Sequence, residues 1–352
     1  MIDPNQRLRN LRQLNGLTQK AFAAELGIGQ AQLSLIERGE RPLTADHMIA
    51  ARQRFDISLD FFDAPPIAYG PNDLNYRTKK LTQAQQDRAA TMFGLIEMEV
   101  RNQADVGNLT ESLNLADYHD VRPRPRREIE ALAAAARDLI GARRDRVINN
   151  VVRCVERLGI LVADIDLPDL GDLIDGISTP TRTDEPFVVA IDFRKPGDRI
   201  RFSGAHELGH VLLHTESRPV NREAREAEAD SFASAFLLPR DQMLDELSPG
   251  LTLAGYARVK ARWGVSMQAI IRRALDLGVI DQDRYRSLHI QISSRGWRKT
   301  EPVEIPREAP AITTPKIGGM RRGISIGSAP NTVGDDNVVN IFGRKSPSET
   351  WR

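Results

Sequence analysis

The chain has 352 residues, in which 49 Lys and Arg residues nearly balance 48 Asp and Glu residues, giving a formal net charge of +1. With 41% hydrophobic and 28% charged residues, its composition is that of a folded protein and excludes a chain that is disordered throughout. The charge balance excludes a uniformly basic nucleic-acid coat. The single cysteine, Cys154, excludes an intrachain disulfide framework and a cysteine-rich zinc site.

The length suits two or three domains of ~100–200 residues each. No apolar run approaches the ~18–20 residues that cross a membrane, and the first residues do not follow the pattern of a signal peptide. We therefore expect a cytoplasmic protein without a membrane partner.

Residues 1–64 form the first predicted domain, in which apolar positions at helical spacing indicate several short helices. A helix over residues 18–26, a sharp turn at Gly27 and a helix over residues 30–38 have the spacing of a helix-turn-helix. In that motif the second helix lies in the major groove of DNA.

The same segment resembles the XRE (Cro/CI-type) family in Gln19, Ala23, Gly27, Ile36-Glu37 and Gly39. The resemblance implies DNA binding, and glutamine side chains suit adenine edges while arginine and glutamine can bind phosphate. The expected base contacts are Gln30, Ala31, Gln32 and Ser34, and the expected phosphate contacts include Gln19 and Arg38.

The charge of this segment gives DNA binding little support, because residues 1–62 carry eight basic and seven acidic side chains. Gly29 also stands where a Ser or Thr usually caps the recognition helix. The alternative is a protein-interaction module that pairs with a partner repressor. Formation of a homodimer would add the affinity of a second half-site.

Residues 65–127 are expected to be a helical linker region that ends in a basic, proline-stiffened connector at residues 122–127. The next domain, 128–299, is expected to be α+β and mostly helical. Its predicted helices and strands are followed by a Pro-, Gly-, Ser- and Thr-rich segment, 300–352, which predicts a flexible, disordered tail. Helices are expected over 128–140, 143–158, 203–214, 222–238, 251–263 and 266–277, and strands over 160–162 and 187–191, the latter in a hairpin with 199–202.

Three histidines fall in one predicted helix, where His206 and His210 at i, i+4 can present two ligands to a tetrahedral Zn²⁺. Glu207 follows the first ligand directly and can reach a metal-bound water, which is the H-E-x-x-H arrangement of metalloproteases. His214 does not have the spacing of a third histidine ligand, so we expect it to pack or to support a ligand.

A catalytic zinc site needs a third protein ligand. Glu226 and Asp230 share a face of the next predicted helix, so one can bind metal while the other accepts a hydrogen bond from a ligand histidine. We assign Glu226 as the ligand and Asp230 as the hydrogen-bond acceptor. Glu228 lies about 200° around the helix from Glu226 and is expected to point away. These residues would also suit a solvated helix, but the strands before them and the acidic helix after them favour a zinc site.

The stretch from His206 to His214, followed by residues 226–239, resembles the ImmA/IrrE family of zinc metallopeptidases, and the likeness continues through 263–268 to 294–299. The resemblance implies a zincin-like domain with a small sheet that cleaves a partner helix-turn-helix repressor. It also implies that His206, His210 and Glu226 hold the metal and that Glu207 is the general base. An extended substrate would pair with an exposed strand edge, for which residues 187–191 are the candidate.

Two functions are therefore open. The first is a DNA-binding regulator and site-specific zinc endopeptidase that relieves repression by hydrolysing a peptide bond in its partner repressor. The second is a non-proteolytic XRE-family transcriptional regulator whose zinc fold senses a ligand or partner. An intact base beside the metal favours the enzyme. The donor set does not separate Zn²⁺ from Mn²⁺, and no residue is assigned to stabilise the oxyanion.

Overall fold

The computed structural model describes residues 3–67, 69–70, 73–75, 81–103, 124–165, 170, 173–179, 187–214 and 220–311. Within them the chain is mostly helical with one small sheet, which confirms the predicted fold class. None of the described helices is long and apolar enough to cross a membrane. Residues 312–352, the larger part of the expected tail, lie outside the described residues.

The first unit consists of α1 (Pro4–Leu14), α2 (Gln19–Glu25), α3 (Gln30–Glu37), α4 (Ala45–Phe55) and the 3-10 helix η1 (Leu59–Asp63). The sequence sets these boundaries because polar side chains cap the starts of three helices: Asp3 caps α1, Thr18 caps α2 and Thr44 caps α4. Gly27 turns the chain between α2 and α3 with a φ of +69°, which a side chain would disfavour. Gly29 caps α3 without a side-chain hydrogen bond.

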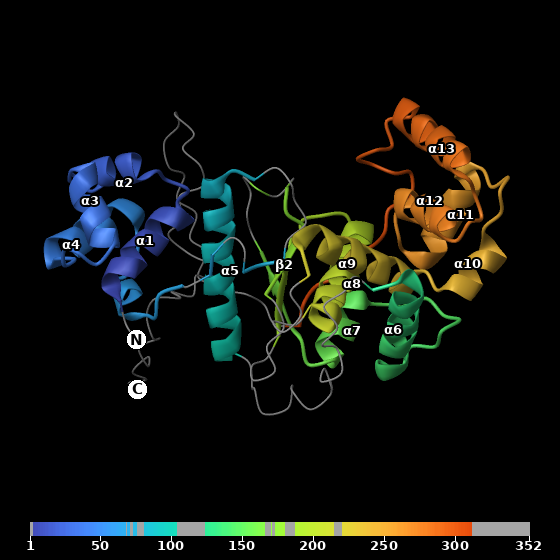
Figure 1. Ribbon diagram of the computed structural model, residues 1–352, viewed down its shortest axis with the longest axis horizontal. Coiled ribbons are helices and arrows are strands. Elements are labelled where there is room, and N and C mark those ends of the chain that lie inside the picture. The colour runs from blue at the N-terminus through green and yellow to red at the C-terminus, as the bar shows by residue number, and fades with distance from the viewer. Residues whose placement is uncertain are drawn as a thin grey trace, which may run out of the picture.

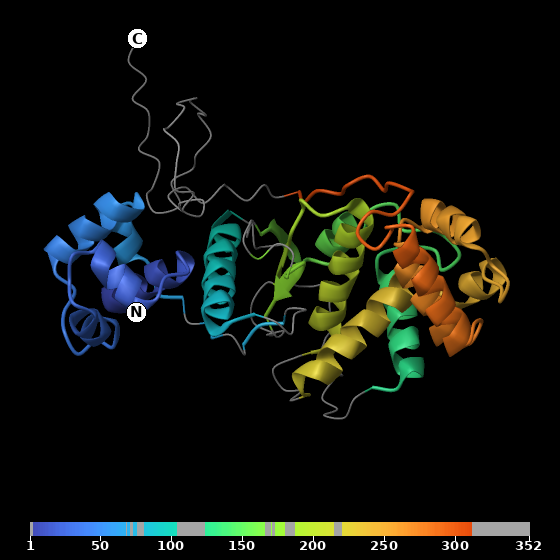
Figure 2. The same ribbon diagram turned by 90° about the horizontal axis from the view of Figure 1, so that it is seen from above.

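A long helix, α5 (Gln83–Gln103), lies between the first unit and the sheet in both ribbon views (Figure 1, Figure 2). Its apolar side chains join one continuous hydrophobic core with α1 to α4 on one side and the sheet on the other. Phe93, which is fully buried in this core, is one such side chain. Within the stretch expected to be a linker, α5 is therefore a packed layer that joins the two units.

The sheet contains β1 (Leu161–Asp164), β2 (Gly176–Ser178) and β3 (Val188–Ile191) in the order β1-β3-β2. β1 runs parallel to β3 and β2 runs antiparallel to it. Both faces are covered, which is why β1 and β3 consist mostly of apolar residues. Leu161, Val188 and Ile177 share the core with α5, whereas Val162 and Val189 share a second core with α7 (Val151–Arg157) and α8 (Gly197–Leu213).

On that second face, α8 packs along α9 (Arg222–Leu237), and α6 (Arg126–Leu139) lies against α9. Gly209 makes the close packing of α8 and α9 possible, because a Cβ there would lie 3.0 Å from Phe232 Cδ1 and 3.2 Å from Ala229 Cα. The helices α10 (Arg240–Glu246), α11 (Leu253–Trp263), α12 (Met267–Asp276) and α13 (Gln282–Ser294) follow and lie at the opposite end of the molecule from α1 to α4 (Figure 1).

Residues 301–311, at the start of the expected tail, run back from α13 across the starts of α8 and α7 (Figure 2). Two carboxylates hold this segment. Glu301 accepts a hydrogen bond from Lys260 and from the backbone N–H of Met267 at the start of α12. Glu308 pairs with Arg201 and accepts the backbone N–H of Val152. These residues are thus part of the folded domain.

Three local predictions are wrong. The helix expected over 143–158 begins only at Val151, because the Asn150 side chain caps it by accepting the N–H of Arg153. Residues 199–202, expected as a hairpin strand, are the first turns of α8, which starts directly after Pro196. Most of residues 187–191, from Val188 to Ile191, form the central strand β3, so this segment is not an exposed edge.

Candidate functional site

The centre of the site is a pair of histidines on α8 facing a carboxylate on α9. The Nε2 atoms of His206 and His210 lie 3.0 Å apart, and each lies 3.5 Å from an oxygen of Glu226. Ligand atoms of these three residues all lie within 4.8 Å of one another, so they can surround one metal ion. Two imidazoles and one carboxylate form a donor set that suits Zn²⁺ with one position left open.

Glu226 fits the metal best of the three. Both of its oxygens are buried, and neither accepts a hydrogen bond from another part of the described chain. A buried carboxylate without hydrogen-bond donors is costly unless a cation compensates it. The residues present therefore fit a divalent metal ion.

The non-ligand nitrogens of the histidines have partners of their own. His206 Nδ1 lies 3.0 Å from Oδ1 of Asp230, the residue predicted from the sequence to accept its hydrogen bond. His210 Nδ1 lies 2.8 Å from His214 Nδ1, and His214 Nε2 lies 3.0 Å from Glu228 Oε2. Glu228, which was expected to point away from Glu226, joins the site through its contact with His214.

The ionisation of these groups follows from burial and from their contacts. Burial opposes the charge on His206, but its contacts with Asp230 and Glu226 outweigh burial and raise the pKa of His206 to about 10. Burial lowers the pKa of His210 to about 3. Although burial disfavours the ionised form of Glu226, its contacts with the two histidines lower its pKa. At neutral pH His210 is thus neutral and Glu226 ionised, as metal binding requires, whereas His206 must lose its proton when metal binds.

Glu207 projects from α8 toward β2. Its Oε2 accepts a hydrogen bond of 2.6 Å from Ser178 Oγ, and a Cβ at Gly176 would lie 2.6 Å from its Oε1, so only glycine fits there without movement. Burial raises the pKa of the Glu207 carboxyl to about 7. A cavity of about 10 Å³ beside it matches the size of one water molecule. The cavity is lined by Asp175, Gly176, Phe202, Ser203, His206 and Glu207.

The sheet edge beside Glu207 is β2, and residue 75 already pairs with it. Asn75 N–H donates to Ser178 O at 2.7 Å, and Ser178 N–H donates to Asn75 O at 3.1 Å. Sequence reasoning missed Ser178 and Asn75, because a three-residue strand and a one-residue bridge leave no pattern to detect.

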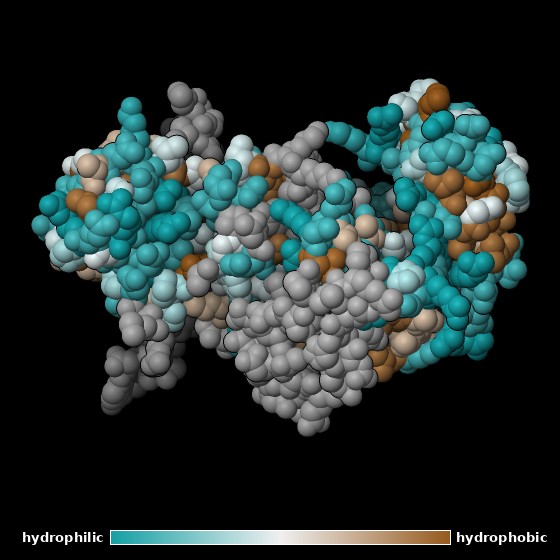
Figure 3. All heavy atoms as spheres, viewed as in Figure 1, coloured by the Kyte–Doolittle hydropathy of each residue, from teal (hydrophilic) through white to brown (hydrophobic). Residues whose placement is uncertain are grey.

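The expected DNA contacts lie on α3 or beside it. Gln30 and Ala31 are exposed at its start, and Gln32 is half-buried against the ring of His47 at 3.2 Å. Ser34 Oγ accepts a hydrogen bond from Arg38, which also pairs with Glu40. The visible surface of this unit is mostly hydrophilic (Figure 3). The ion pair with Glu40 means that the positive charge of Arg38 already has an acidic partner within the fold.

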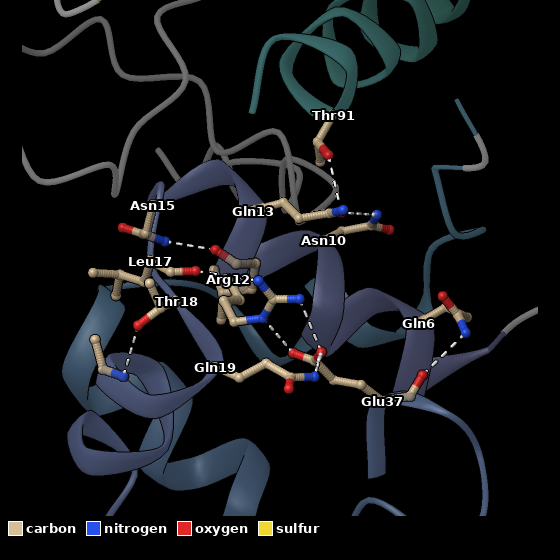
Figure 4. Close-up of polar contacts among 12 residues, drawn as sticks. Gln6, Asn10, Arg12, Gln13, Asn15, Leu17, Thr18, Gln19, Glu37 and Thr91 are labelled. Carbon is tan, nitrogen blue, oxygen red and sulfur yellow. Dashed lines mark hydrogen bonds and ion pairs between the residues drawn. The ribbon is translucent and has the colours of Figure 1, made fainter. Parts of the chain in front are cut away.

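Gln19 is turned inward rather than left free. Its Nε2 donates a hydrogen bond of 2.9 Å to Glu37 Oε2, and Arg12 binds the same carboxylate through two nitrogens (Figure 4). This contact fixes α3 to α1 and α2. Phosphate binding by Gln19 stays a prediction.

Two known protein families match separate parts of the chain. The family described as an IrrE N-terminal-like domain matches residues 155–275, and the family described as helix-turn-helix matches residues 8–62. The chain joins an XRE-type helix-turn-helix domain to an IrrE-like peptidase domain. The three residues that can surround a metal ion, His206, His210 and Glu226, and the neighbouring Glu207 all fall inside the IrrE-like match.

Two curated proteins are similar to this chain. A 58-residue stretch is 38% identical to the HTH-type transcriptional regulator PrpR of Mycobacterium tuberculosis, covering 16% of this chain and 12% of that protein. The propionyl-CoA carboxylase regulator of Cereibacter sphaeroides is 25% identical over 315 residues, covering 76% of this chain and 63% of that protein. The chain thus spans less than two thirds of the length of either relative.

Proposed function

We propose that this protein is a DNA-binding transcription regulator whose IrrE-like domain is a zinc endopeptidase acting on a partner helix-turn-helix repressor. The observation that carries the proposal is the buried, hydrogen-bond-free carboxylate of Glu226 facing His206 and His210, with Glu207 beside them. A metal held by these residues would polarise the scissile carbonyl and lower the pKa of a water toward ~7.

Glu207 supplies the proton transfers. Ser178 holds its Oε2, so Oε1 takes the proton from the attacking water and later delivers it to the leaving amine. Asp230 keeps the ring of His206 oriented. An extended substrate would pair with the outer edge of β2, which requires it to replace Asn75 there.

A second candidate is a non-proteolytic regulator that senses a ligand or partner through the same domain. Two observations favour it: both similar proteins are named as regulators, and the cavity beside Glu207 has only the volume of one water molecule.

The experiment that separates the two incubates the zinc-loaded full-length protein with the helix-turn-helix protein encoded next to its gene. We expect a single cleavage by the wild type and by Asp241→Asn, which alters an exposed carboxylate on α10. We expect none by Glu207→Gln, which should still bind zinc. Operator binding without cleavage under any inducing condition would favour the second candidate, and cleavage by Glu207→Gln would contradict the mechanism.

A further inference from the structure

A buried chain of hydrogen bonds runs from the metal centre to the start of α6. It links His210, His214 and Glu228 and ends at the backbone N–H of Arg124, which lies 2.6 Å from Glu228 Oε1. The three residues are 0%, 1% and 4% exposed, so their polar side-chain atoms need hydrogen-bond partners within the protein. The helices that carry them, α8 and α9, lie side by side (Figure 1).

The direction of this chain follows from its acidic end. An ionised carboxylate accepts only, so Glu228 accepts Arg124 N–H at Oε1 and His214 Nε2–H at Oε2. A neutral imidazole that donates from Nε2 has its lone pair on Nδ1. The short contact between the two Nδ1 atoms then requires His210 to donate its Nδ1–H.

That assignment leaves the lone pair of His210 on Nε2, which faces His206 Nε2 and Glu226. The opposite tautomer would place a proton on the atom that must bind metal. For His206, Asp230 fixes the proton on Nδ1 directly. His210 has no carboxylate against its Nδ1 among the described residues, so the position of its proton depends on His214.

We propose that Glu228, acting through His214, is a positioning residue that keeps the proton of His210 on Nδ1 and so leaves Nε2 open for the metal. The inference rests on the metal site of the proposed function but requires no hydrolysis. It gives His214 and Glu228 a role beyond packing, and it makes Arg124, within the basic connector, part of the support of the metal site.

The test combines the tautomer of His210 with metal affinity. In full-length, metal-free protein labelled with ¹⁵N-histidine, long-range ¹H–¹⁵N spectra at pH 8 should show His210 as the Nδ1–H form in the wild type. We expect Glu228→Gln and His214→Phe to lose that preference or its hydrogen bond. Both should weaken zinc binding ~10–100-fold in competition with a chromophoric chelator.

The matched control is Glu130→Gln, which alters another carboxylate that bonds a buried side chain, Arg273, away from the metal. It should leave zinc affinity unchanged even if stability falls. An Nε2–H tautomer of His210 in the wild type, or zinc affinities of Glu228→Gln and His214→Phe within twofold of the wild type, would overturn the proposal. A wild type with the expected tautomer and affinities that cleaves no protein would leave this inference standing and refute the peptidase.

Discussion

Glu37 provides the sharpest test of how α3 is held against α1 and α2. It is 3% exposed and accepts hydrogen bonds from Arg12 Nε at 2.6 Å, Arg12 Nη2 at 2.9 Å and Gln19 Nε2 at 2.9 Å (Figure 4). Glu37→Ala leaves the guanidinium of Arg12 with Leu17 O at 3.2 Å as its remaining acceptor among the described residues. Removing one partner of a buried ion pair costs ~3–5 kcal/mol. Because Arg12 keeps 14% exposure, we expect a loss of about 3 kcal/mol.

The assay is urea denaturation of the full chain, followed by far-UV circular dichroism. Gln19→Ala, which removes one neutral donor to the Glu37 carboxylate, should lower the free energy of unfolding by about 1.5 kcal/mol. The double variant Arg12→Met/Glu37→Leu should lie within about 1 kcal/mol of the wild type, since replacing both charges leaves no buried ion unpaired. A loss below 1 kcal/mol for Glu37→Ala, or a double variant as unstable as that single one, would refute the reasoning.

Three further predictions follow from α5 and from the metal centre. Phe93→Ala should lower the free energy of unfolding by ~3–5 kcal/mol and leave one transition, because its core spans both units; tryptophan fluorescence and circular dichroism that give separate midpoints would contradict this. The pKa of His206, raised to about 10, means that its proton must leave before metal binds. Zinc affinity should therefore rise about tenfold per pH unit from pH 7 to 9, with about one proton released on binding. Calorimetry in buffers of different ionisation enthalpy measures this release, and binding without proton release would argue against the contacts of His206 with Asp230 and Glu226. Ser178→Ala should lower kcat about tenfold, the worth of a hydrogen bond of ~1.5 kcal/mol to an ionised group, at unchanged zinc affinity; an unchanged kcat would show that Ser178 does not orient Glu207.

The sequence was informative where geometry depends on neighbours along one helix. His206 and His210 share a face of α8, and Glu226 and Asp230 share a face of α9, because 3.6 residues make one turn. These pairs could be assigned without knowing how the helices pack. The fold class was also predictable, since apolar periodicity separates helices from short strands.

Contacts between distant segments could not be read in the same way. Ser178 meets Glu207 because β2 lies beside α8, and nothing in a three-residue strand signals its place in the sheet. A buried central strand and a partly covered edge strand give similar short apolar patterns in a sequence. The pattern of residues 187–191 therefore could not show that most of this run lies in the central strand of the order β1-β3-β2. Glu228 was predicted to point away from Glu226, but its partner His214 becomes visible only when α8 and α9 are packed together.

We propose that His206, His210 and Glu226 hold a metal ion, and the metal content of the purified protein tests this most directly. Full-length wild type, equilibrated with excess zinc and freed of loosely bound ions by gel filtration, should retain one zinc per chain by plasma mass spectrometry. Glu226→Ala and His210→Ala should retain far less than one at unchanged helical content. A wild type that holds no zinc or manganese, or variants that hold a full equivalent, would contradict the account.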